Sequence, residues 1–212
     1  MVEKLHEVIS DVAQSIVLNC SHPNYAYMRV IFPISGGGGE AYLGAGHGTV
    51  GILYFLMKAI ELIPELRLNN QIREKLGHSL GFICKLMEEN NGDLPFVEGD
   101  TSVARHFCHG APGTIPMLLQ AVETFPDQEA KLVALAQLAG EATWRHGLVL
   151  KGNGLCHGIA GNGYLLHTLY RFFANRTDCI DLKVKETNEK NANIWRTRAF
   201  AFARALYLPE VQ

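Results

Sequence analysis

Hydrophobic and polar residues repeat along this chain with the period of an α-helix, in segments of two kinds. One kind is amphipathic and charged, as in residues 66–87 and 129–146, and predicts helices with one face in solvent. The other kind is apolar on almost every side and begins at a His-Gly-x-x-Gly sequence, near His47, His109 and His157. A helix that is apolar on every side must be enclosed on every side. The pattern therefore predicts an inner layer of buried helices, wrapped by an outer layer of amphipathic ones.

No segment shows the strict alternation of a half-buried strand, so we expect an all-α fold. Because the two kinds of helix follow each other along the chain, the predicted architecture is an α/α toroid, or part of one. Further helices are expected over residues 2–18 and 195–208, with polar loops over residues 22–40 and 174–193.

The apolar segments begin with related sequences, which indicates an internal repeat. The sequence Cys-His-Gly-Ala-Pro-Gly at residues 108–113 recurs as Cys-His-Gly-Ile-Ala-Gly at residues 156–161. A third copy at residues 47–51 keeps the His-Gly-x-x-Gly frame but follows Gly46 instead of a cysteine. Two of the three repeated helix starts therefore carry residues that bind metals.

Zinc prefers thiolate and imidazole ligands, and a catalytic zinc site keeps three protein ligands and one open position. Cys108, Cys156 and His157 would supply such a set if the toroid brings equivalent helix ends together. Consecutive residues inside a helix point about 100° apart and would not easily share an ion. We therefore expect Gly154 and Gly158 to place Cys156 and His157 in a tight turn instead.

Composition narrows the possible partners and the cellular compartment of the protein. The net charge of −2 includes no basic excess that would favour a nucleic-acid partner, and we expect no transmembrane segment. Five cysteines and no signal-peptide pattern indicate a reducing, cytoplasmic setting, with Cys20, Cys84 and Cys179 as structural residues. The G-x-G-x-x-G sequence at residues 46–51 follows no predicted strand, so we reject a dinucleotide site.

Residues 42–48, 106–113 and 151–161, taken together, resemble the lanthionine synthetase C-like family, most closely its eukaryotic members. The resemblance implies an α/α toroid of helix pairs around a zinc site. Only three inner helices are recognisable, so we expect a truncated form that corresponds to roughly the C-terminal half of the family's ring. Residues 1–212 would then form a single partial toroid domain, with the motifs inside residues 42–173.

The resemblance also implies roles for individual residues. Cys108, Cys156 and His157 match the family's zinc ligands, and His47 matches a histidine expected to act as acid or base. Lys151 matches a lysine that contacts glutathione in eukaryotic members. The implied activity is a transferase-like formation of a C–S bond, in which glutathione adds to dehydroalanine or dehydrobutyrine residues of a peptide or protein.

Other interpretations stay open at this stage. The chain could bind zinc or glutathione without catalysis, as an adaptor, or be an inactive truncated isoform. A prenyltransferase-like zinc toroid is a weaker alternative, because that ligand set includes an aspartate with no match here. Two further residues stand apart from the family pattern: Phe107 replaces the usual tryptophan, and His109 has no assigned role and is expected to be structural or to support the site.

Overall fold

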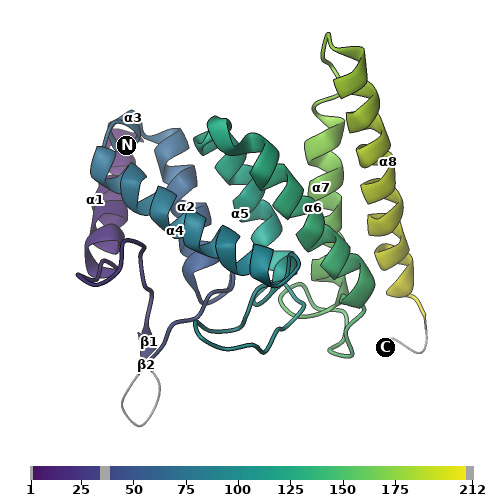
Figure 1. The fold of residues 1–212 in the computed structure, drawn as a ribbon, viewed down its shortest axis with the longest axis horizontal. Coiled ribbons are helices and arrows are strands. Elements are labelled where there is room, and N and C mark those ends of the chain that lie inside the picture. The colour runs from purple at the N-terminus through teal and green to yellow at the C-terminus, as the bar shows by residue number, and fades with distance from the viewer. Residues whose placement is uncertain (1, 34–38, 209–212) are drawn as a thin grey trace.

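The computed structural model describes residues 2–33 and 39–208 and shows an all-α protein, as predicted (Figure 1). The helices, in chain order, are α1 (Val2–Asn19), α2 (Thr49–Leu62), α3 (Pro64–Arg67), α4 (Asn70–Glu89), α5 (Ala111–Thr124), the 3₁₀ helix η1 (Pro126–Gln128), α6 (Glu129–His146), α7 (Ile159–Ala174) and α8 (Leu182–Ala205). Two short antiparallel strands, β1 (Phe32–Pro33) and β2 (Gly39–Glu40), form the only sheet in this part of the chain. No helix among the described residues has the length and apolar character needed to cross a bilayer.

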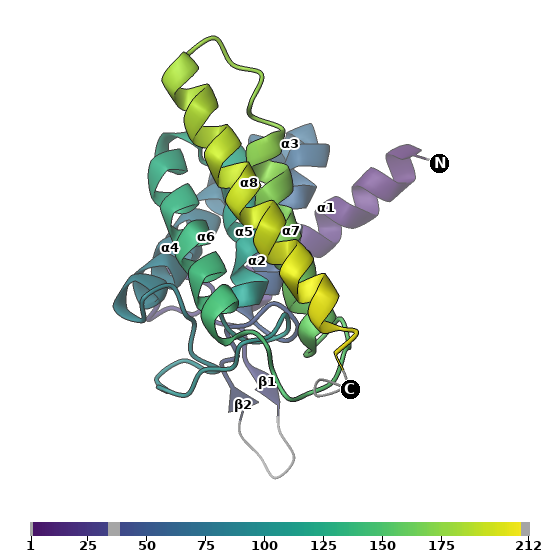
Figure 2. The ribbon, with the colours of Figure 1, turned by 90° about the vertical axis from the view of Figure 1, so that its right-hand side faces the viewer.

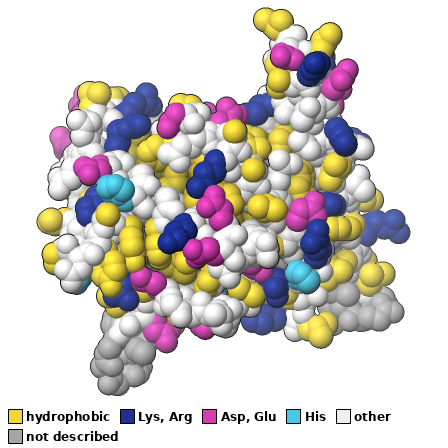
Figure 3. Space-filling view, in the orientation of Figure 1, with side chains coloured by type: hydrophobic (Ala, Val, Ile, Leu, Met, Phe, Trp, Pro, Cys, Tyr) yellow, Lys and Arg dark blue, Asp and Glu magenta, His cyan; other side chains and the backbone are white. Residues whose placement is uncertain are grey.

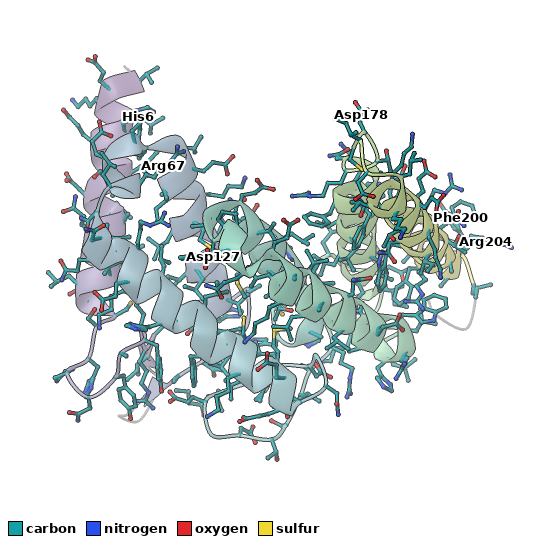
Figure 4. The ribbon with its side chains drawn as sticks, turned by 45° about the horizontal axis from the view of Figure 1, so that its top comes forward. His6, Arg67, Asp127, Asp178, Phe200 and Arg204 are labelled. Carbon is teal, nitrogen blue, oxygen red and sulfur yellow. The ribbon has the colours of Figure 1, made fainter. Side chains whose placement is uncertain are left out.

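Inner and outer helices alternate along the chain, which confirms the predicted arc of an α/α toroid. Helix α5 lies between α2 and α7, and these three form the inner row. Helix α4 packs beside α2, α6 covers α5 and α7, and α8 runs along α7 at one end of the row (Figure 2). Helix α1 lies at the other end, so that His6 of α1 and Phe200 of α8 project from opposite ends of the arc (Figure 4).

The burial of each inner helix depends on its position among the three inner helices. Within α5, every residue except Pro116 and Glu123 is buried, because α5 has an inner neighbour on each side and α6 behind it. The flanking inner helices are less enclosed: Phe55 of α2 is 70% exposed and Tyr164 of α7 is 67% exposed. The prediction that all-round apolar helices are enclosed therefore holds fully for α5 and only partly for α2 and α7.

The loops that precede the inner helices gather at one end of the arc, at the lower edge of Figure 1. Glu98, in the loop before α5, ties the N-terminal connector to this region: its carboxylate accepts hydrogen bonds from the Tyr27 hydroxyl at 2.5 Å and the Arg29 Nε at 2.6 Å. The Tyr27 ring also stacks on Phe82 of α4 at 4.0 Å. Elsewhere, acidic and basic side chains are interspersed over the face seen in Figure 3 and form no patch of a single sign.

The predicted loop over residues 174–193 is wrong for most of its length, because α8 begins at Leu182. The Asp181 carboxylate caps this helix by accepting from the backbone N–H groups of Lys183 and Val184 at 2.9 and 3.3 Å. The first turns of α8 are mostly polar, and their apolar residues Leu182 and Val184 are exposed, so the sequence shows no apolar stripe there. Helix α4 also begins later than expected, where Asn69 caps it by accepting from Ile72 N–H at 3.1 Å. Most of the glycine run, residues 36–38, lies outside the described residues.

Helices α6, α7 and α8 approach each other at Gly140. A Cβ atom added there would lie 2.5 Å from Cδ1 of Leu169 and 2.6 Å from Cη2 of Trp195. Both of these side chains are buried, and the indole ring has little room to move. The close packing of the three helices therefore depends on the missing side chain.

Replacing Gly140 by alanine is expected to lower the free energy of unfolding by about 1–3 kcal/mol, because the added methyl group overpacks this contact. Gly81 is the matched control, since it lies inside α4 with open space around it. There, alanine should raise the free energy of unfolding by about 0.5–1 kcal/mol through helix propensity. Urea unfolding followed by circular dichroism measures both, and equal responses would contradict the packing argument.

Candidate metal centre

The three repeated His-Gly turns lie together at the N-terminal ends of α2, α5 and α7. Their backbones are joined at one residue, Cys108. The Cys108 N–H donates to the carbonyl oxygen of Cys156 at 3.2 Å, and the Cys108 carbonyl oxygen accepts from Gly46 N–H at 3.1 Å. The repeat seen in the sequence is therefore a repeat in space, with the copies in direct hydrogen-bonded contact.

Glycine is required where these turns meet. A Cβ atom on Gly46 would lie 2.6 Å from the Cβ of Cys108, closer than two such carbons can approach. Gly110, two residues after Cys108, has φ of +96°, a conformation that L side chains rarely adopt. An added Cβ there would also overlap the carbonyl oxygen of Ala104. The glycines of the repeat thus allow the chain to reverse tightly and its copies to touch.

The structure brings together the three residues that the sequence indicates as metal ligands. Ligand atoms of Cys108, Cys156 and His157 all lie within 4.8 Å of one another, and the Cys108 Sγ is 3.8 Å from the His157 Nδ1. Bond lengths at a tetrahedral zinc ion place a sulfur and a nitrogen ligand about 3.6 Å apart. The donor set and its spacing therefore fit a zinc ion.

The predicted tight turn before α7 is present. Gly158 N–H donates to the Gly154 carbonyl oxygen at 3.0 Å, and α7 begins only at Ile159. Cys156 and His157 therefore precede the helix and lie on the same side of the turn. Both are exposed, whereas Cys108 is buried, so the cluster is open to solvent on one side.

Burial, reinforced by the neighbouring Cys156, raises the pKa of the Cys108 thiol to about 11. Two sulfur atoms this close cannot easily both carry a negative charge, because adjacent thiolates repel each other. A divalent cation removes that repulsion and favours the deprotonated ligands. Without a cation, the raised pKa favours the protonated Cys108 thiol, so thiolate ligation at this pair would depend on the metal itself.

His106 is part of this site although sequence reasoning gave it no role. Its side chain is buried, with Nδ1 3.3 Å from the Cys108 Sγ and Nε2 3.4 Å from the Nζ of Lys151. Desolvation lowers the pKa of His106 to about 4, with a smaller contribution from the Lys151 charge. The only signal in the sequence is a second histidine two residues before the cysteine, in His106-Phe107-Cys108.

His47 packs on His109, the residue after Cys108, and does not belong to the cluster. Its ring is parallel to that of His109, with centroids 5.3 Å apart, and His109 stacks in turn on Phe96 at 3.9 Å. His109 is buried, and its Nδ1 has no hydrogen-bond partner in the structure. His47 itself is exposed, so its imidazole can meet a substrate from solvent.

An apolar surface groove lies away from the cluster, between α7 and α8. It has a volume of about 460 Å³ and includes Tyr164, His167 and Phe200. None of the predicted site residues lines it, so this groove is not part of the metal centre.

Comparisons with known proteins point to one family. The sequence profile described as "Lanthionine synthetase C-like protein" matches residues 14–199. The chain is 37% identical over 132 residues to "Glutathione S-transferase LANCL1" of Danio rerio. The aligned region covers 62% of this chain and 31% of that protein. It is 33% identical over 134 residues to "LanC-like protein GCL1" of Arabidopsis thaliana, which covers 63% of this chain and 29% of the relative.

A solved structure shows the same fold. The chain superposes on nisin cyclase with a TM-score of 0.51 and 16% sequence identity, over 77% of this chain and 41% of that one. At this identity the likeness concerns the fold alone. The matched region spans about a third of the length of the curated relatives.

Alanine at Gly46 is expected to displace Cys108, because the new Cβ would overlap the cysteine side chain. In the presence of a chelator, Cys108 should then be alkylated faster than in the unchanged protein, where burial and a raised pKa keep it slow. The free energy of unfolding should fall by about 1–3 kcal/mol. Peptide mapping by mass spectrometry after timed exposure to iodoacetamide gives the rate for each cysteine.

Gly154→Ala serves as the control, since this glycine lies beside Cys156 but has open space around it. It should leave the alkylation rate of Cys108 unchanged. Equal rates for Cys108 in the two variants would show that the contact at Gly46 does not hold the cysteine in place.

Proposed function

Because this chain belongs to the lanthionine synthetase C-like family, we propose that it binds one zinc ion through Cys108, Cys156 and His157. The observation that carries the proposal is the convergence of these three ligand atoms within 4.8 Å, from two turns that the sequence repeats. The open side of the cluster leaves room for a further ligand, as in catalytic zinc sites.

We further propose that the protein adds the thiol of glutathione to dehydroalanine or dehydrobutyrine residues of a peptide or protein. The Danio rerio relative is named a glutathione S-transferase, which supports glutathione as the thiol. A bound zinc ion would supply the positive charge that favours a thiolate nucleophile at neutral pH.

The remaining groups would bind the substrate and move a proton. Addition forms a C–S bond at the β-carbon of the dehydrated residue, and the α-carbon must then receive a proton. His47 is exposed and packs on His109, the residue after Cys108, and an imidazole can donate that proton near neutral pH. The Lys151 ammonium, also in this region, would bind a carboxylate of glutathione. A reducing, cytoplasmic compartment would keep the Cys108 and Cys156 thiols available.

A second function, binding of zinc and glutathione without catalysis, is favoured by one observation. The match covers only about a third of the curated relatives' length, so their activity does not transfer to this chain by similarity alone. An adaptor of this kind would keep the metal centre and Lys151 but form no product.

The purified protein is expected to contain about one zinc ion per chain. The double variant Cys108→Ala, Cys156→Ala should contain almost none, because two of three ligands are lost. Cys179→Ser is the control, since Cys179 lies outside the cluster and its loss should leave the zinc content unchanged. Elemental analysis of the dialysed proteins measures this, and a double variant that retains its zinc would refute the ligand assignment.

Incubation with glutathione and a dehydroalanine peptide is expected to yield an adduct whose mass equals the sum of the two. His47→Ala should slow its formation by about 10²–10⁴-fold while the zinc content stays unchanged, because only the proton donor is removed. Mass spectrometry follows the adduct over time. Glutathione binding by calorimetry without any zinc-dependent adduct would instead favour the non-catalytic adaptor.

A further inference from the structure

His106 connects two groups that the proposed function uses separately. Its imidazole lies between the Cys108 Sγ, at 3.3 Å from Nδ1, and the Lys151 Nζ, at 3.4 Å from Nε2. The side chain is only 5% exposed. Its backbone is held by a pair of hydrogen bonds with His109, at 3.1 and 3.2 Å, which close the turn around Cys108. The turn that presents the cysteine therefore also fixes the backbone of His106.

The partners of His106 determine which ring nitrogen carries the proton. A lysine ammonium has donors and no acceptor, so Nε2 must accept from Lys151. In a neutral imidazole the proton then lies on Nδ1. The Nδ1–H group can then donate to the Cys108 Sγ, which would accept as the thiolate that a bound metal ion favours. The hydrogen bonds thus run in one direction, from Lys151 through His106 to Cys108.

His106 does not belong to the ligand set itself. The cluster of ligand atoms within 4.8 Å contains Cys108, Cys156 and His157 and does not include His106. The rings of His106 and His157 are 6.0 Å apart and nearly perpendicular. His106 therefore contacts a sulfur of the proposed ligand set without belonging to that set, as the hydrogen-bond partners of metal ligands commonly do.

We propose that His106 is a positioning residue that holds the Cys108 sulfur as a hydrogen-bond acceptor and holds the Lys151 ammonium at a fixed place beside the metal centre. This inference rests on the proposed zinc ligation by Cys108. Since an ammonium has three N–H groups, one can point at His106 while two stay free for a carboxylate.

The contacts of His106 set the distance between the Cys108 sulfur and the Lys151 ammonium, and the thiol and carboxylate of a substrate would have to match that distance. Lys151 lies one imidazole ring away from a metal-binding sulfur, so the favoured substrate is a thiol that carries a carboxylate at a matching distance. Binding of that carboxylate and binding of the metal are coupled through His106, and such coupling is reciprocal.

Three variants separate the two contacts. The amide nitrogen of asparagine can occupy the place of the histidine Nδ1, so His106→Asn keeps a donor to Cys108 and loses the contact with Lys151. Glutamine reaches further, so His106→Gln keeps an acceptor for Lys151. His106→Leu loses both contacts while it preserves an apolar side chain in a buried position. Thermal unfolding and circular dichroism establish that each variant is folded.

The first measurement concerns the metal. In the cobalt-substituted protein, His106→Leu is expected to shift the thiolate-to-cobalt charge-transfer band and to weaken cobalt affinity by about 10–100-fold. His106→Asn should restore both toward the unchanged protein. A purely structural role for His106 would alter unfolding but would not move the band.

The second measurement concerns the thiol. Calorimetry should show that His106→Leu weakens glutathione binding about as much as Lys151→Met does. The double variant should bind glutathione no more weakly than either single variant. His106→Gln should recover part of the lost affinity. At a metal concentration that fills the site in every variant, cysteamine, a thiol without a carboxylate, should bind all of these proteins alike. Additive losses in the double variant would overturn the link between His106 and Lys151.

The outcomes distinguish the two proposals. If the unchanged protein binds neither zinc nor cobalt, the ligand assignment fails and this inference fails with it. If the metal binds through Cys108 but the band, the cobalt affinity and glutathione binding are the same in His106→Leu, only the role of His106 is refuted.

Discussion

The candidate site depends on the backbone contact between three turns at Cys108. Its N–H and its carbonyl oxygen are both used to join neighbouring copies of the repeat, through Cys156 and Gly46. Because these hydrogen bonds join backbone atoms, they set the distances between the turns whatever the side chains are. Gly46 and Gly110 permit the contact, one by leaving space and the other by adopting a positive φ. The side chains that converge at this end of the arc do so because the three inner helices start there together.

Much of this organisation could be predicted from the sequence, because a repeat leaves a local signature. Helices α2, α5 and α7 each begin two residues after the histidine of the repeated frame. The clustering of Cys108, Cys156 and His157 follows from the equivalence of these helix starts. The first turns of α8 could not be predicted in the same way. They are mostly polar and exposed, and they are held by the cap at Asp181 and by a hydrogen bond from Asn188 to the Arg176 carbonyl oxygen, so the apolar pattern used elsewhere is absent.

The role of His106 could not be predicted either, for a different reason. Its two partners are Cys108, two residues away, and Lys151, 45 residues away. Nothing in the local sequence indicates that a histidine in a loop is buried, or that a distant lysine reaches it. Only the packing of the loop before α5 against the loop before α7 brings the two together. The histidine two residues before Cys108 is visible in the sequence, but its contact with Lys151 is a property of the assembled fold.

The ligands of the candidate site come from both sides of a long segment of chain. Cys108 precedes α5, and Cys156 and His157 precede α7, so that α5, η1 and α6 lie between them. A metal ion held by all three would therefore act as a cross-link that closes a loop of about fifty residues, in the same sense as a disulfide. An ion that binds only the folded state would stabilise it by an amount that grows with the logarithm of its affinity. The proposed metal centre would in this way also hold the N-terminal ends of α5 and α7 together.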